Sequence, residues 1–115
     1  MNASELLRRY ADGERNFSGV DLSPANLTDS NLSGSNLTAS NLSDSNLSYC
    51  NLSDSNLSRA QLAWVNLGGA DLTGANLTGA DLTGANLVGN IMDNTLYCNT
   101  TLPDGTVIIE ATYFD

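Results

Sequence analysis

Large apolar residues recur at every fifth position over most of this chain. Leucine occupies each fifth position from 22 to 87, and Phe17, Met92, Tyr97 and Leu102 extend the series to eighteen units. A half-buried strand repeats its inward residues every two positions, and an amphipathic helix every 3.6. A period of five fits neither element. It indicates a short extended segment followed by a corner, repeated many times.

Each five-residue unit has its own internal pattern. A small residue, a polar residue and the large apolar residue follow one another, which is the alternation of a short strand whose first and third side chains point inward. The next two residues must turn the chain, and the second of them is Gly five times in succession from Gly69 to Gly89. Glycine adopts the positive φ of such turns without a steric penalty. The repeat therefore predicts a parallel β-solenoid whose successive coils hydrogen-bond to one another.

The polar position before each leucine indicates the number of sides in a coil. It is Asn at 16, 26 and every tenth position up to 86, whereas the intervening positions mix Asn with Asp21, Gln61, Asp71, Asp81 and Ile91. A ten-residue sub-period fits opposite faces of a four-sided coil of twenty residues, and it does not fit a three-sided coil of fifteen. Eighteen units then make about four and a half coils, roughly 22 Å of stacking.

The two ends of the solenoid need covers. Residues 1–14 are predicted to form a capping α-helix, with Asn2 and Glu5 as a capping pair and Gly13 as the C-terminal stop. Its apolar residues over the first coil would be Leu6, Leu7 and Tyr10. Residues 15–104 form the predicted β-helix.

Residues 105–115 form a tail outside the repeat. Its segment VIIEATYFD is the most apolar in the chain and follows a PDGT turn. We expect the tail to cover the open strand edges of the last coil in a monomer, or alternatively to pair with a second copy in a tail-to-tail homodimer. The covering side chains would be Val107, Ile108, Ile109, Tyr113 and Phe114.

The segment ADLTGANLTGADLTGANL at residues 70–87 resembles the pentapeptide repeat proteins, whose motif is A(D/N)LXX. The resemblance covers residues 15–104, and the opening segment resembles the N-terminal cap of the cyanobacterial members. It implies a right-handed quadrilateral parallel β-helix with Leu, Phe or Met in its interior. One departure is the run of Ser at the small position, where Ala is usual. We expect those buried hydroxyls to donate to neighbouring backbone carbonyls.

Charge narrows the range of partners. The chain has 13 acidic residues against 4 basic ones, no histidine, and a net charge of −9. Such a surface repels nucleic acid and anionic membranes, so we expect no direct binding of either. No apolar run reaches the length of a membrane span, and the first ten residues lack the apolar region of a signal peptide. These features predict a cytoplasmic protein whose partner, if any, is another protein.

The residues for catalysis or metal binding are missing. Without histidine there is no Ser-His or Cys-His nucleophile pair and no imidazole ligand, and the aspartates occupy different outward columns. We therefore predict a non-enzymatic protein with no cofactor and no metal. Cys50 and Cys98 lie about 2.4 coils apart, roughly 11 Å along the axis, which exceeds the Cα limit of about 7 Å for a disulfide. Both are predicted to be free thiols, with Cys50 inert in the core.

Three functions fit this pattern. The first is a protein-interaction or regulatory module, with Trp64, Tyr49 and Arg59 as a raised patch at the variable corner position. The alternative is a purely structural role, in which Trp64 lies flat across Gly69 or Gly84 and binds no partner.

The second function is an acidic DNA mimic that acts on a DNA-binding protein such as gyrase, which the resemblance to quinolone-resistance members suggests. Residues 15–102 hold seven Asp against two Arg, a net charge of −5, or about 0.2 charge per Å against one per ~1.7 Å in duplex DNA. The third is an ice-binding surface built on regular Ser and Thr columns, although no face carries paired rows of Thr.

Overall fold

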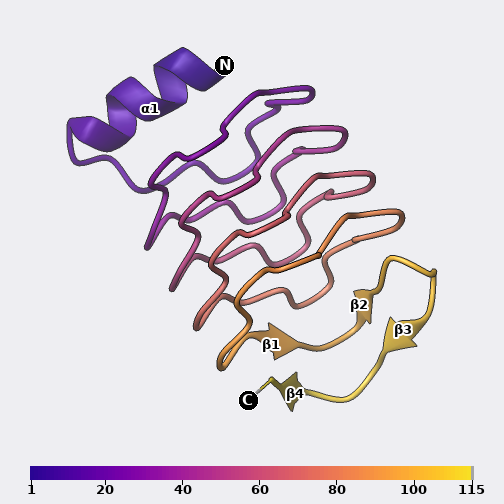
Figure 1. Ribbon diagram of the computed structural model, residues 1–115. Coiled ribbons are helices and arrows are strands. Elements are labelled where there is room, and N and C mark those ends of the chain that lie inside the picture. The colour runs from indigo at the N-terminus through magenta and orange to yellow at the C-terminus, as the bar shows by residue number, and fades with distance from the viewer. Residues whose placement is uncertain (115) are drawn as a thin grey trace.

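The computed structural model describes residues 1–114, which form one stack of coils with a helix across its first end (Figure 1). Helix α1 (Ala3–Ala11) comes first, and four short strands form at the other end: β1 (Leu96–Tyr97), β2 (Thr100–Thr101), β3 (Val107–Ile108) and β4 (Thr112–Tyr113). The described chain measures 36 × 25 × 22 Å along its principal axes. The coils between helix and strands hold most of the sequence.

Every coil is twenty residues long. Parallel bridges join each polar residue to the one twenty positions later, from Asn16 with Asn36 through to Asp81 with Thr101. On each side the polar residue makes two of the bonds between coils: Asn86 donates its N–H to the carbonyl of Val65 and accepts the N–H of Leu67. The corner residue adds a third, as Gly69 N–H donates to Val88 O. The expected four-sided coil is confirmed, and it makes positions twenty apart neighbours on the same face.

The corners are tight turns that leave the large apolar residues inside. In a typical corner Ala70 N–H donates to Leu67 O at 3.0 Å, and Gly69 between them has a φ of +69°. A positive φ at the third residue with this hydrogen bond is the pattern of a type II turn. The leucines from 22 to 82 are at most 3% exposed. They form one continuous column of core.

The buried serines only partly follow expectation. Ser55 donates its hydroxyl to Leu52 O at 2.6 Å, but the hydroxyls of Ser35 and Ser40 have no partner within residues 1–114. The hydroxyl of buried Ser45 accepts the N–H of Ala25 at 3.0 Å. The prediction that the buried serines donate to backbone carbonyls is therefore wrong for Ser35, Ser40 and Ser45. The carbonyl in each turn already accepts a backbone N–H, so a serine hydroxyl must share it, as Ser55 does.

The helical cap forms as the sequence indicates. Asn2 accepts the N–H of Glu5 at 2.9 Å, and the chain leaves the helix at Gly13, which has a φ of +99°. The Glu5 carboxylate accepts from Arg9 at 2.7 Å rather than from the N-cap backbone, so the capping box is only half made. Leu6 is fully buried against the first coil. The apolar core is thus covered at this end by a side chain of α1.

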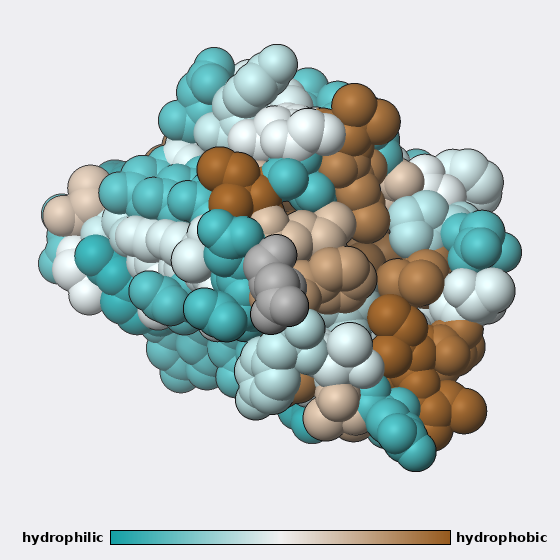
Figure 2. All heavy atoms as spheres, turned by 60° about the horizontal axis from the view of Figure 1, so that its bottom comes forward, coloured by the Kyte–Doolittle hydropathy of each residue, from teal (hydrophilic) through white to brown (hydrophobic). Residues whose placement is uncertain are grey.

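The tail folds back over the last coil of its own chain, which confirms the expected self-cover; whether the protein is a monomer or a tail-to-tail homodimer stays a prediction. Strand β3 pairs antiparallel with β2, and β4 pairs antiparallel with β1. The cover is made by the backbone, because Val107, Ile109 and Tyr113 stay more than half exposed. The expectation that these three side chains cover the coil is therefore wrong; Phe114 stacks on Tyr97 with ring centroids 4.7 Å apart. Figure 2 shows the resulting brown apolar areas at this end.

Both cysteines are free, as predicted. Burial raises the pKa of Cys50 to about 12, so this thiol stays protonated and unreactive at neutral pH. Cys98 is half-buried and lies 3.4 Å from the carbonyl of Ile109. No helix among residues 1–114 has the length and apolar character needed to cross a membrane.

Candidate functional site

The repeated Asn-Leu-Ser/Thr pattern stabilises the corners. In almost every unit the Oδ1 atom of Asn or Asp accepts the backbone N–H two residues later, as Asp71 does from Thr73 at 2.9 Å. The Thr73 hydroxyl donates to the same oxygen at 2.6 Å. Asn and Asp interchange because both place an oxygen at this distance, whereas Gln61, one methylene longer, makes no such bond. The polar groups of the outer wall are thus largely engaged within the chain.

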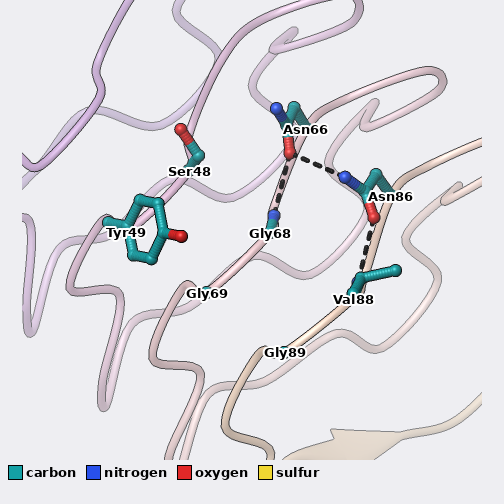
Figure 3. Close-up of a pocket in the computed structure, with 8 residues that line it drawn as sticks. All are labelled: Ser48, Tyr49, Asn66, Gly68, Gly69, Asn86, Val88 and Gly89. Atoms are coloured by element: carbon teal, nitrogen blue, oxygen red, sulfur yellow. Dashed lines mark hydrogen bonds between the residues drawn. The ribbon is translucent and has the colours of Figure 1, made fainter.

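One of the four faces departs from this pattern. We call it the asparagine face after its column Asn26, Asn46, Asn66 and Asn86. Here Gly68 replaces the usual Ser or Thr, so Asn66 Oδ1 receives no hydroxyl. It accepts the Gly68 N–H at 2.9 Å and the side-chain amide of Asn86 at 3.1 Å instead (Figure 3).

The missing side chains leave a hollow of about 430 Å³ on this face. Its lining residues are Ser48, Tyr49, Asn66, Gly68, Gly69, Asn86, Val88 and Gly89. None of them is charged, although the chain as a whole has a net charge of −9. The Tyr49 ring stands at one edge of the hollow and the glycine backbone runs along it (Figure 3). The hollow therefore offers an uncharged surface with exposed amides and one aromatic ring.

Two aromatic residues stand on the corner columns that border the asparagine face. A Cβ added at Gly84 would lie 2.2 Å from Trp64 Cε3, and one added at Gly69 would lie 2.4 Å from Tyr49 Cε1. Each ring thus lies against a glycine of the next coil, which no larger residue could replace without displacing it. Even so, Trp64 remains 64% exposed and Tyr49 68%. The rings rest on the solenoid and present their outer surfaces to solvent.

These corner residues have an unfavourable backbone conformation. Trp64, Tyr49 and Arg59 have φ values of 60°, 57° and 58°. The left-handed region costs a residue with a Cβ roughly 1–2 kcal/mol and costs glycine almost nothing. The later coils have Gly at the corresponding corners.

The sequence-predicted residues do not all share one face. Trp64 and Tyr49 border the asparagine face on consecutive corner columns. Arg59 is on the column before Trp64, because four corners make one twenty-residue coil. It therefore lies at the corner diagonally opposite the column of Tyr49, packed over Gly79. Trp64 and Tyr49 are the pair that a single partner surface could contact together.

Sequence reasoning missed the hollow itself. Its signal was present as NLGG at residues 66–69, where most other units have Ser or Thr after the leucine. Within residues 1–114 no group of three or more His, Cys, Asp or Glu side chains is placed to hold a metal ion.

The comparisons with known proteins agree with this architecture. The pentapeptide repeats family matches residues 16–54 and 55–92 in eight copies. HetL, a pentapeptide repeat protein involved in heterocyst differentiation regulation in the cyanobacterium Nostoc sp. strain PCC 7120, is 36% identical with a TM-score of 0.87, over 89% of this chain and 43% of HetL. The chain thus spans less than half the length of HetL.

Two further cyanobacterial structures are similar. The pentapeptide repeat protein alr5209 from Nostoc PCC 7120 is 37% identical with a TM-score of 0.81, over 82% of this chain and 78% of alr5209. Rfr23 from Cyanothece 51142 is 40% identical with a TM-score of 0.69, over 70% of this chain and 54% of Rfr23. A search of the curated proteins found no significant match. The chain belongs to the pentapeptide repeat family and has its fold, a right-handed quadrilateral β-helix with a short N-terminal helix.

Proposed function

We propose that this protein is a non-enzymatic interaction module that binds another protein across the asparagine face, between Trp64 and Tyr49. The observation that carries the proposal is the placement of two large aromatic residues, both about two-thirds exposed, at strained corners. Seven other non-glycine residues share this left-handed backbone, so the conformation belongs to the repeat. What distinguishes Trp64 and Tyr49 is the large aromatic surface that each leaves in solvent beside the hollow.

The chemistry of the face indicates what the partner presents. An uncharged hollow with a glycine floor accommodates a short extended segment that carries a small apolar side chain. The amides of Asn66 and Asn86 can bond to the backbone of that segment, and Trp64 and Tyr49 are residue types enriched at interface hot spots. The involvement of HetL in the regulation of heterocyst differentiation supports a regulatory process for this protein too. We further propose that it acts in the cytoplasm.

The two alternatives have less support. A DNA mimic needs rows of negative charge, but the corner aspartates Asp29, Asp44 and Asp54 stand on three different columns. An ice-binding face needs hydroxyl columns free to order water. In this chain many of the Ser and Thr hydroxyls donate to an adjacent Asn or Asp oxygen, as Thr78 does to Asn76 at 2.6 Å. Gyrase supercoiling assays and thermal hysteresis measurements would detect either activity.

The test uses glycine substitutions, which remove a side chain and relieve backbone strain together. The partner is first captured from the native cell, then purified and titrated against Trp64→Gly and Tyr49→Gly. We expect each substitution to weaken binding by about 30-fold or more, a loss of roughly 2 kcal/mol. The melting temperature should stay equal or rise, because each variant relieves the left-handed strain.

Two further variants make the test specific. Gly68→Ser restores the repeat pattern and fills the hollow; its Cβ would lie 3.1 Å from Asn66 Oδ1 and 3.3 Å from Asn86 Nδ2, a tight fit. It should also weaken binding. Arg59→Gly, with the same change of backbone strain on the opposite corner, should not. Wild-type affinity in both aromatic variants, or equal losses in all four proteins, would contradict the proposal.

A further inference from the structure

The last coil is only half covered by the tail. Strands β3 and β4 lie over β2 and β1, which occupy two consecutive sides of the coil. On the other two sides, residues 85–93, several backbone groups have no hydrogen-bond partner within residues 1–114. They include the N–H groups of Leu87, Gly89 and Met92 and the carbonyls of Ala85 and Asn90. In the preceding coil the equivalent groups of Leu67 and Leu72 bond to Asn86 and Ile91.

The outer side of the tail strands is also a free strand edge. Thr101 opposes Val107 and Leu96 opposes Tyr113 in the two antiparallel pairs. Thr101 and Leu96 use their own N–H and C=O groups toward the coil below, so each pair is of the non-hydrogen-bonded kind. The N–H and C=O groups of Val107 and Tyr113 therefore point away from the molecule, one layer beyond the last coil.

We propose that two copies join end to end, so that the tail of each completes the half of the last coil that the other leaves open. The end of each molecule is a step, with the tail on the high half and residues 85–93 on the low half. A two-fold axis along one diagonal of the coil places the high half of each copy on the low half of the other. The coil spacing of about 4.8 Å is kept across the junction.

Strand direction and hydrogen bonds fit this arrangement. The tail runs antiparallel to the coil beneath it, and the two-fold axis reverses the winding of the second copy. The tail of one copy therefore runs parallel to the last coil of the other, as successive coils do within the solenoid. Val107 would bridge Ala85 and Leu87 of the other copy, and Tyr113 would bridge Asn90 and Met92. Each bridge has the two hydrogen bonds that Asn86 makes with the coil below it.

Side chains at this end also depart from the repeat in a way that suits the junction. Ile91 stands where earlier coils have Asn or Asp, and Val88 where most have Ser or Thr; they are 46% and 79% exposed. In the proposed dimer Tyr113 of one copy lies beside Ile91 of the other. A cross-section of 25 × 22 Å gives roughly 1,100 Å² of buried surface in total, near the lower end of specific interfaces. The dimer should therefore be reversible.

The first test is sedimentation equilibrium of the full chain up to about 1 mM, in about 0.3 M salt so that repulsion between two acidic chains is screened. We expect a monomer–dimer equilibrium. Ile91→Asn, which restores the repeat, should raise the dissociation constant at least about tenfold because it removes apolar contact. Trp64→Gly should leave it unchanged, which separates this junction from the proposed partner face. A monomer throughout this range would overturn the proposal.

The second test fixes the geometry. Ile91→Cys and Tyr113→Cys are combined with Cys98→Ser, and mild oxidation is followed on a non-reducing gel. Neighbouring strands bring residues 91 and 113 of different copies to about 5 Å between Cα atoms, within disulfide range. We expect a covalent dimer. The control pair, Ile91→Cys with Ser18→Cys, should not cross-link to the same extent, because Ser18 is in the first coil. A dimer that fails to cross-link through 91 and 113 would overturn the interlocked arrangement.

Discussion

The two ends of the solenoid solve the same problem in different ways. At the first end α1 covers the first coil with a side chain, Leu6, which is fully buried and joins the core. At the last end the tail pairs through its backbone and leaves Val107, Ile109 and Tyr113 largely exposed. At the first end the core is covered, although the N–H and C=O groups of Asn16, Asp21, Asn26 and Asn31 at the edge of the first coil have no backbone partner within residues 1–114. At the last end two sides have such free groups and exposed apolar side chains lie beside them, which another chain can cover.

The last end shows that backbone pairing on two sides can stabilise the end of a β-helix while the other two sides stay uncovered. Pairing of β3 and β4 satisfies the carbonyl and amide groups of two sides, and the Tyr97–Phe114 contact adds one aromatic pair. Burial raises the pKa of Tyr97 to about 12, so its ring is well shielded although its cover is partial. The other two sides stay uncovered. In the proposed dimer the tail of a second copy fits onto this uncovered half, and the end is self-complementary in that sense.

The largest loss of stability should come from removing the buried side chain that covers the core at the first end. Leu6→Ala removes a fully buried side chain from α1, and such substitutions cost about 2–5 kcal/mol of unfolding free energy. The matched substitution at the open end is Ile109→Ala, where the side chain is 69% exposed and the cost should be within about 0.5 kcal/mol. Urea unfolding measures both. Similar losses in the two variants would show that the ends are not built differently.

A smaller effect should follow from removing the tail. Truncation after Gly105 deletes β3, β4 and the Phe114 ring, and exposes the last coil on all four sides. We expect a loss of roughly 1–3 kcal/mol, less than for Leu6→Ala, because the tail contributes backbone hydrogen bonds and little apolar burial. Thermal unfolding with light scattering should show a lower melting temperature and aggregation. If both stayed as in the full chain, the tail would be only loosely attached.

Most of the fold follows from the sequence because it rests on short-range chemistry repeated many times. The period of five sets the corner, the ten-residue spacing of Asn sets four sides, and Asn2 with Gly13 marks the helix ends. Each of these signals is local, and a coil of twenty residues is the regular arrangement that keeps every leucine inside. These features could therefore be predicted, and the structure confirms them.

The tail side chains were not predictable in the same way. Val107 opposes Thr101, and this register points its side chain outward; a slip of one residue would have turned Val107 and Tyr113 toward the core. The register depends on how the PDGT turn closes, where Thr106 donates to Asp104 and Leu102 N–H to Thr106 O. The register of the tail strands is not encoded in the periodicity of the sequence. The hollow at Gly68 was readable as a break in the repeat, but its meaning depends on the Asn–Ser/Thr bonds seen only in the structure.

The smallest expected effect concerns the pKa of one carboxylate at each end of the solenoid. The Arg9 guanidinium, by hydrogen bond and charge, lowers the pKa of Glu5 from 4.5, and hydrogen bonds from Thr106 lower the pKa of Asp104 from 3.8. Both carboxylates therefore contribute stability above these ordinary values, and the contribution is lost as pH falls through each lowered pKa.

Salt should separate the two carboxylates. At about 1 M sodium chloride the attraction to Arg9 is screened, so the pKa of Glu5 should move back toward its ordinary value. That of Asp104 should hardly change, because its partner Thr106 is uncharged. An NMR pH titration at low and high salt measures both shifts. Equal movement of the two pKa values would contradict this assignment of causes.

The open edge is tested most directly by amide hydrogen exchange at equivalent positions in neighbouring coils. In dilute protein the N–H groups of Leu67 and Leu72 should be protected by their bonds to the next coil, at 2.8 and 2.7 Å, while those of Leu87 and Met92 exchange fast. Near about 1 mM, protection of Leu87 and Met92 should rise in step with the dimer fraction. Equal protection of all four amides in the dilute monomer, or fast exchange of Leu87 and Met92 in a fully formed dimer, would contradict the account.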